Sequence, residues 1–234
     1  MTLVKICGIS EAKHARAAAA FGADFIGMVF APSSRQVTIG EAKRIAAGLG
    51  KSAQDGIRPF TTEAIEDALG QRRPLLVGVF ADQDADTIND IASEVGLDLV
   101  PLSGSEPWEV CSHINRPVLK CMKIREGETV GDLRSHLHEG AIVLLDPYVE
   151  GTYGGTGRTL DWDVASDIAR ERPTVLAGGL NPDNVHAAVE QVQPWCVDVS
   201  SGVETEGKKD TGKIRAFVQN AKETGRAAGN SEHD

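Results

Sequence analysis

The chain has few aromatic residues, a deficit of basic residues and no long hydrophobic run. Only 5% of its 234 residues are aromatic, which argues against a base-stacking surface for nucleic acid. Its 24 Lys and Arg against 34 Asp and Glu give a formal charge of −10, which disfavours generic binding to phosphate backbones. No apolar run reaches the ~18 residues of a membrane span. We therefore expect a small-molecule ligand, with neither nucleic acid nor a membrane as partner.

Cysteine and histidine motifs are missing as well. The four cysteines form no Cys-x-x-Cys pair, and the first residues show no signal-peptide pattern. We therefore expect reduced cysteines and a cytoplasmic location. His136 and His138 lie close together, but in a polar stretch typical of a solvated helix face. The sequence thus predicts no metal site.

Short apolar segments alternate with longer helical ones along the chain. This pattern predicts an α/β protein with a single (β/α)8 TIM barrel over residues 1–223 and a C-terminal tail over 224–234. An open, doubly wound sheet is the alternative, although it usually has fewer strands. The predicted strands are Leu3–Cys7, Phe25–Phe30, Leu75–Phe80, Leu97–Leu102, Val118–Met122, Ala141–Leu145, Thr174–Ala177 and Cys196–Ser200. The predicted helices are Glu11–Phe21, Gly40–Leu49, Thr87–Val95, Pro107–Ile114, Val130–Leu137, Trp162–Ala169, Pro182–Val192 and Thr211–Lys222, with a further one at Ala64–Leu69 after the polar segment Gly50–Thr62.

The alternation of side chains in the first strand points Lys5 and Cys7 into the barrel. The same alternation points Asp198 inward from the last strand, which neighbours the first strand in a closed barrel. We therefore expect a Lys5–Asp198 ion pair, which on its own would be structural. A nearby ammonium group would also lower the pKa of Cys7 and favour its thiolate.

Polar and glycine-rich residues follow several predicted strands, where the active site of a barrel lies. Asp146 ends one strand and is followed by a loop with Gly154, Gly155 and Gly157. This loop is neither a P-loop nor a dinucleotide fingerprint, but its backbone N–H groups can approach an anion closely. Gly178-Gly179 and Ser201-Gly202 follow the last two strands, where barrels frequently bind phosphate. An acid beside an anion cradle suggests chemistry on a phosphorylated small molecule.

Two further residues could take part. Cys7 has no histidine partner in the sequence, and a thiol facing Asp146 across a barrel suits proton transfer better than acyl transfer. Arg35 could clamp a substrate carboxylate or be a solvated surface residue.

Stretches along nearly the whole chain together resemble the phosphoribosylanthranilate isomerase family. They include Val4-Lys-Ile-Cys-Gly8, Ser33-Ser-Arg35, Leu144-Leu-Asp146, Gly154-Gly-Thr-Gly157, Leu176-Ala-Gly-Gly-Leu-Asn-Pro182 and Val197-Asp-Val-Ser-Ser-Gly-Val-Glu204. The resemblance implies a cofactor-free Amadori rearrangement of N-(5-phosphoribosyl)anthranilate in tryptophan biosynthesis, by a monomer or homodimer. It implies that Asp146 is the general acid, that Cys7 is the general base and that Arg35 holds the anthranilate carboxylate. The implied phosphate site comprises Gly155, Gly157, Gly178, Gly179, Ser201 and Gly202.

One stretch departs from that family's pattern. The family usually has Gln-Leu-His-Gly after the fourth strand, where this chain has Pro101-Leu-Ser-Gly104. Because an amide and an imidazole are missing there, substrate specificity is the property most open to change. Another phosphosugar isomerase or epimerase, and a non-catalytic phosphosugar-binding protein, are the alternative readings.

Overall fold

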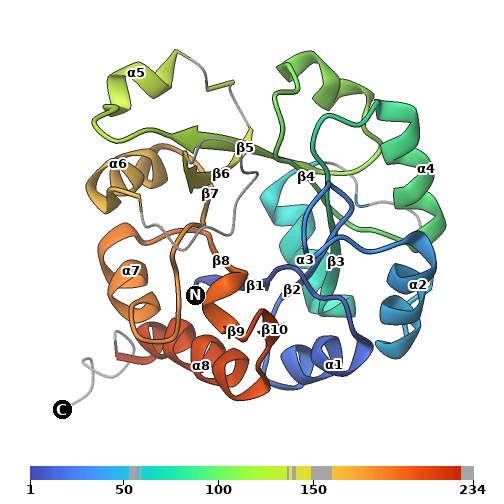
Figure 1. The fold of residues 1–234 in the computed structure, drawn as a ribbon. Coiled ribbons are helices and arrows are strands. Elements are labelled where there is room, and N and C mark those ends of the chain that lie inside the picture. The colour runs from blue at the N-terminus through green and yellow to red at the C-terminus, as the bar shows by residue number, and fades with distance from the viewer. Residues whose placement is uncertain (53–56, 58–59, 136, 139–140, 149–159, 228–234) are drawn as a thin grey trace.

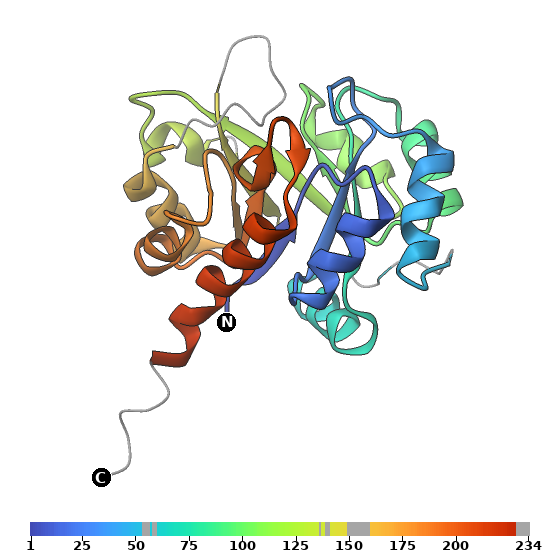
Figure 2. The same cartoon turned by 60° about the horizontal axis from the view of Figure 1, so that its bottom comes forward.

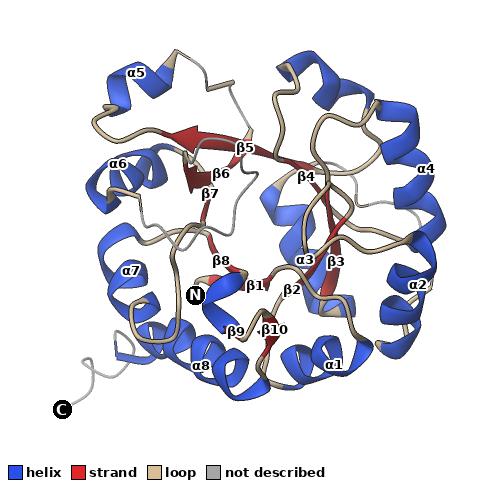
Figure 3. Cartoon of the chain, in the orientation of Figure 1, coloured by secondary structure: helices blue, strands red, loops and turns tan. Residues whose placement is uncertain are grey.

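The computed structural model describes residues 1–234 apart from 53–56, 58–59, 136, 139–140, 149–159 and 228–234. In the described part, a ring of parallel strands is surrounded by helices (Figures 1 and 3). The strands are β1 (Leu3–Ile6), β2 (Phe25–Val29), β3 (Leu75–Val79), β4 (Val100–Leu102), β5 (Val118–Ile124), β6 (Ile142–Pro147), β7 (Thr174–Leu176), β8 (Cys196–Val199), β9 (Glu204–Thr205) and β10 (Lys208–Lys209). The helices are α1 (Ala12–Ala20), α2 (Ile39–Gly48), α3 (Thr62–Arg72), α4 (Ala85–Val95), α5 (Val130–Arg134), α6 (Trp162–Glu171), α7 (Val185–Val192) and α8 (Thr211–Ala227), with 3-10 helices η1 (Trp108–His113) and η2 (Ser201–Val203).

The strand order shows how the ring closes. The sheet runs β3-β2-β1-β8-β7-β6-β5-β4, and its neighbouring strands are parallel. Its two ends are joined by backbone hydrogen bonds from Gly78 N to Leu99 O (3.1 Å) and from Phe80 N to Pro101 O (3.0 Å). The predicted (β/α)8 barrel is therefore confirmed, and the carboxyl ends of its strands share one face.

The alternation of side chains divides the apolar residues into two cores. Val4 and Ile6 of β1 belong to the larger core, which also contains helix residues such as Ala18 and Phe217. The smaller core includes inward-facing strand residues such as Leu144. Strands buried on both faces need apolar residues at nearly every position, which explains the short continuous apolar runs.

Polar caps fix where several helices begin. Thr38 and Glu41 form a reciprocal capping box at α2, and Asp161 accepts a hydrogen bond from Asp163 N at the start of α6. At α7 the prediction was wrong by three residues. Asn181 accepts hydrogen bonds from the backbone N–H groups of residues 183 and 184, so it caps a preceding turn and α7 starts at Val185.

Several other predicted elements differ in kind or in length from those observed. The helix predicted at Pro107–Ile114 is the 3-10 helix η1, in which the Glu109 carbonyl accepts a hydrogen bond from Ser112 Oγ (2.7 Å) and is less available to the backbone. The strand predicted at Val118–Met122 continues to Ile124. The strand predicted at Leu97–Leu102 is shortened to β4, with Leu99 forming an isolated bridge.

The C-terminal helix is longer than predicted. α8 runs from the β9–β10 hairpin along the barrel to Ala227, so the first four residues of the predicted tail are helical (Figure 2). Its residues Ile214, Phe217 and Val218 are buried, and no proline interrupts the sequence that follows them. Among the described residues, no helix is both long and apolar enough to cross a membrane.

Candidate active site

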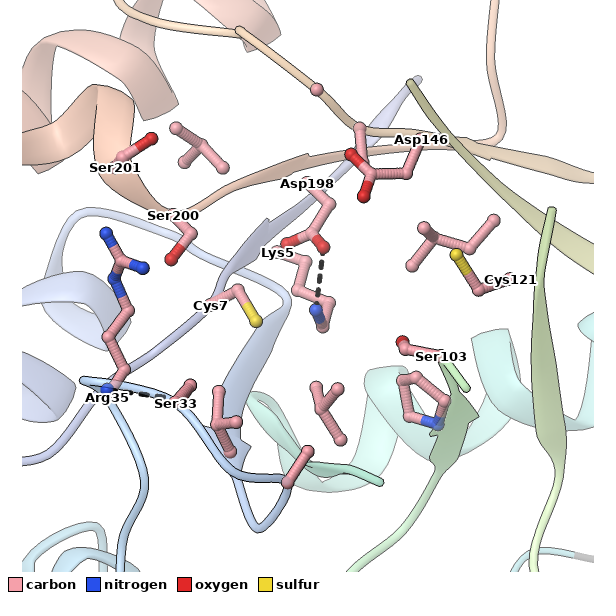
Figure 4. Close-up of a pocket in the computed structure, with 18 of the residues that line it drawn as sticks. Lys5, Cys7, Ser33, Arg35, Ser103, Cys121, Asp146, Asp198, Ser200 and Ser201 are labelled. Carbon is pink, nitrogen blue, oxygen red and sulfur yellow. Dashed lines mark hydrogen bonds and ion pairs between the residues drawn. The ribbon is translucent and has the colours of Figure 1, made fainter. Parts of the chain in front are cut away.

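A cavity of about 390 Å³ opens at the carboxyl ends of the strands. Figure 4 shows that its walls combine the ends of β1, β6 and β8 with the loops that follow them. Among the predicted site residues, the cavity is lined by Cys7, Arg35, Asp146, Gly178, Gly179 and Ser201. Gly202 is the next residue in η2, whereas Gly155 and Gly157 lie outside the described residues.

The predicted ion pair between the first and last strands is confirmed. Lys5 lies opposite Asp198 in the parallel register of β1 and β8, and its Nζ donates to Asp198 Oδ2 at 2.8 Å. The Lys5 side chain is only 1% exposed. The second oxygen of Asp198 is buried without a hydrogen-bond partner in the described part of the chain, and the residue lines the cavity.

Cys7 is buried directly after β1 and on the cavity wall. Burial raises the pKa of its thiol, while the Lys5 ammonium acts in the opposite direction and the Asp198 carboxylate raises the pKa further. Lys209 also acts to lower it. The predicted lowering effect of Lys5 is present, but desolvation outweighs the neighbouring cations, so the net shift of the Cys7 pKa is upward.

Asp146 lies on the other side of the Lys5–Asp198 pair from Cys7 (Figure 4). It is in register with Lys123 on β5, and the two side chains form an ion pair at 2.5 Å. Burial raises the pKa of Asp146, and the charge of Lys123 only partly opposes this shift. Sequence reasoning missed Lys123 because it ended the strand at Met122; the alternation that points Cys121 inward would have pointed Lys123 inward as well.

The loops after β7 and β8 are built from glycine and serine and contact each other closely. Gly178 and Gly179 have φ angles of +82° and +61°, a region that side chains disfavour. Asn184 holds this turn by donating from Nδ2 to Gly179 O at 3.0 Å. A Cβ on Gly202 would lie 1.9 Å from Leu180 O, so only glycine fits where the two loops meet.

Arg35 is engaged by a carboxylate that sequence reasoning did not assign to the site. Its Nε and Nη2 donate to the two oxygens of Glu204 at 2.7 and 2.8 Å. Lys209 Nζ donates to Glu204 Oε1 at 2.7 Å and to Ser200 O at 2.8 Å. Glu204 and Lys209 face each other across the β9–β10 hairpin, an element absent from the sequence prediction. The Glu206-Gly207 turn was the available signal.

The end of β4 forms the remaining wall. Pro101 and Ser103 both line the cavity, beside Cys121 of β5. Burial raises the Cys121 pKa to about 12. This wall presents small side chains and one hydroxyl to the cavity. The two residues that differ from the family's Gln-Leu-His-Gly pattern, Pro101 and Ser103, therefore both line the cavity.

The described residues contain no group of three or more His, Cys, Asp and Glu side chains arranged to hold a metal. His138 is exposed, follows α5 and stacks on Trp108 with ring centroids 4.4 Å apart, whereas His136 is outside the described residues. The cavity offers backbone N–H groups and a guanidinium to an anion, and it offers a buried thiol and a buried carboxyl group that can exchange protons with a ligand.

Comparisons with known proteins give one consistent family. The family model described as N-(5'phosphoribosyl)anthranilate (PRA) isomerase matches residues 49–220. An N-(5'-phosphoribosyl)anthranilate isomerase of Dehalococcoides mccartyi is 39% identical over 230 residues, covering 95% of this chain and 97% of the relative. The phosphoribosyl anthranilate isomerase structure from Thermotoga maritima has a TM-score of 0.75 and 35% identity, covering 95% of this chain and 99% of that one. A phosphoribosyl anthranilate isomerase in complex with reduced 1-(o-carboxyphenylamino)-1-deoxyribulose 5-phosphate has a TM-score of 0.73 at 35% identity, with coverage of 95% and 99%.

Proposed function

The chain belongs to the N-(5'-phosphoribosyl)anthranilate isomerase family, and from this premise we propose that Asp146 is its general acid and Cys7 its general base. The chain is an isomerase of tryptophan biosynthesis, and its substrate is N-(5'-phosphoribosyl)anthranilate. The observation that carries the acid–base assignment is the placement of the buried Cys7 thiol and the buried Asp146 carboxyl group in a single cavity.

Asp146 is suited to deliver a proton. Its raised pKa favours the protonated form, which can protonate the ribose ring oxygen. The bond between that oxygen and C1 then breaks, and the anthranilate nitrogen supplies the electron pair that forms an iminium ion. The carboxylate left on Asp146 pairs with Lys123, which stabilises the negative charge that this step creates.

Cys7 is placed to take up a proton in the second step. The iminium ion acidifies the neighbouring C2–H bond, so a modest base suffices. Cys7 takes the C2 proton, and the electrons of that bond neutralise the nitrogen and give an enolamine, which tautomerises to the ketose. Burial opposes thiolate formation, but the ammonium groups of Lys5 and Lys209 and the cationic intermediate all favour it. The rearrangement is internal, so no net oxidation occurs.

Two sets of groups lining the cavity suit the two anionic groups of the substrate. The loops with Gly178, Gly179, Ser201 and Gly202 offer backbone N–H groups to the phosphate, and Gly155 and Gly157 belong to this proposal on the family resemblance alone. Arg35 offers its guanidinium to the anthranilate carboxylate.

The test is turnover of freshly generated phosphoribosylanthranilate, followed by the loss of anthranilate fluorescence. We expect Cys7→Ala and Asp146→Asn each to lower kcat by about 10²–10⁴-fold, the range of a positioned acid or base. Asp146→Asn should still bind the reduced product analogue. Cys121→Ser is the matched control, because Cys121 is a buried cysteine of the same cavity that the mechanism does not use. Undiminished turnover in Asp146→Asn would remove that residue from the mechanism.

A further inference from the structure

The β9–β10 hairpin carries two charged side chains into the wall of the active site. Glu204 and Lys209 are paired in its antiparallel register, and their side chains are 7% and 3% exposed. The turn between them uses Glu206 and Gly207 at φ angles of +51° and +74°. Thr205 Oγ1 donates to Asp210 at 2.9 Å on the outside of the hairpin. The two buried charges are therefore held by the backbone of a tight turn.

Glu204 occupies only one edge of the Arg35 guanidinium. A guanidinium has five N–H groups, and the carboxylate takes one on Nε and one on Nη2. Of the three remaining N–H groups, one on Nη1 and one on Nη2 point to the terminal edge. Arg35 lines the cavity and its side chain is 23% exposed, and among the described residues this terminal edge is left for a second carboxylate.

Lys209 is bonded entirely within the protein. Its ammonium group has three N–H bonds, and its three acceptors are Glu204 Oε1 at 2.7 Å, Ser200 O at 2.8 Å and Ser200 Oγ at 3.4 Å. It therefore contacts the loop that begins the proposed phosphate site as well as the carboxylate that holds Arg35. Arg35, Lys209 and Glu204 together form an ionic group of two cations and one carboxylate, with one net positive charge.

Gly8 brings this ionic group close to the proposed base. A Cβ on Gly8 would lie 2.6 Å from Arg35 Cδ, 3.0 Å from Ser200 Oγ and 3.5 Å from Lys209 Nζ. The three side chains therefore pack over the backbone that follows Cys7. A shift of the hairpin would move Arg35 relative to the reacting atoms.

We propose that Glu204 and Lys209 are positioning residues that fix the Arg35 guanidinium with its terminal edge toward the substrate carboxylate and tie it to the Ser200 loop. This inference rests on the proposed role of Arg35. Neither residue touches the substrate. Glu204 acts by setting the orientation of Arg35, and Lys209 acts by holding Glu204 and Ser200 together. The hairpin thereby sets the distance between the carboxylate and phosphate ends of the site.

The test compares two ligands that differ only in the carboxylate. The first is reduced 1-(o-carboxyphenylamino)-1-deoxyribulose 5-phosphate, and the second is its phenylamino counterpart without the carboxylate. Calorimetric Kd values are measured for the wild type, Glu204→Gln, Lys209→Met and the matched hairpin control Thr205→Val. We expect Glu204→Gln to weaken the first ligand about tenfold and the second by less than twofold, the scale of one charge-assisted hydrogen bond. Lys209→Met should weaken both ligands, and the first more than the second, because Lys209 also holds the Ser200 loop. Thr205→Val should change neither Kd.

Equal weakening of both ligands by Glu204→Gln would overturn the proposal, because the hairpin would then shape the site without acting through Arg35. A wild type that binds both ligands equally would instead refute the role of Arg35 in the proposed function. Glu204→Asp, which keeps the charge but shortens the side chain, serves if Glu204→Gln does not fold. It should also lose affinity selectively for the first ligand, and unchanged selectivity would contradict the positioning role.

Discussion

Gly202 gives the most direct test of how the two loops proposed to bind the phosphate are built. In Gly202→Ala the new Cβ would lie 1.9 Å from the carbonyl oxygen of Leu180 and 2.9 Å from its carbon. Since Cβ atoms essentially never come within 3.0 Å of such an atom, the two groups must separate by at least 3.0 − 1.9 = 1.1 Å. The obstructing atom is backbone and cannot rotate away. The loops after β7 and β8 must therefore move apart.

This displacement has a cost in stability and a cost in activity. Overpacking of this kind typically destabilises a protein by ~1–3 kcal/mol. At about 2–4 °C per kcal/mol for a chain of this size, Tm should fall by roughly 2–12 °C. A misplacement of about 1 Å among substrate-binding groups can lower kcat/KM about 10²-fold. Most of this loss should be a rise in KM and little of it a fall in kcat, because Cys7 and Asp146 are on other loops.

The assay combines scanning calorimetry with turnover and with competitive inhibition by inorganic phosphate, which should weaken in Gly202→Ala. Gly40→Ala is the matched control, because no atom lies within 4 Å of its added Cβ in α2. That substitution should stabilise the protein by ~0.4–1 kcal/mol and leave phosphate inhibition unchanged. An unchanged Tm and unchanged phosphate inhibition in Gly202→Ala would refute the close packing of the two loops.

Two further predictions concern the ion pairs inside the barrel. Lys5→Met leaves the Asp198 carboxylate buried and unpaired, so the free energy of unfolding in urea should fall by ~3–5 kcal/mol. Adding Asp198→Asn should recover part of this loss, and no recovery would contradict a direct pair. Lys123→Met removes the cation that opposes the raised pKa of Asp146, so that pKa should rise further. In an acid–base pair, activity falls on the acid side of the profile when the group with the lower pKa gains its proton. The acid limb of the kcat/KM profile should therefore move to higher pH. An unmoved limb would mean that this limb reports the titration of another group.

Period-two alternation and barrel closure were sufficient to predict the Lys5–Asp198 pair before the structure was known. Both residues lie in short apolar strands where each position has only two possible directions, and the first and last strands of a closed barrel must be neighbours. Fold class and the inner position of Asp146 follow by the same reasoning. These features depend on the alternation of side chains along a strand and on the order of strands in a closed barrel, and both can be inferred from the sequence.

The partners of the site residues could not be predicted in the same way. Glu204 and Lys209 reach Arg35 through a hairpin of two-residue strands, too short to give a periodic signal. Lys123 pairs with Asp146 only because β5 continues two residues beyond the apolar run. The direction of the Cys7 pKa depended on the degree of burial, which the sequence does not specify, and there desolvation exceeded the effect of Lys5.

The charges around the cavity differ between the groups proposed for proton transfer and those proposed for anion binding. When ionised, the Lys5–Asp198 and Lys123–Asp146 pairs each sum to zero, whereas Arg35, Glu204 and Lys209 sum to +1. Among the described residues, the excess positive charge therefore lies at the end proposed to bind the carboxylate, in a chain whose formal charge is −10. The buried surroundings of Cys7 and Asp146 raise both pKa values. Under the proposed mechanism, a cationic iminium intermediate favours the Cys7 thiolate and so opposes the effect of burial.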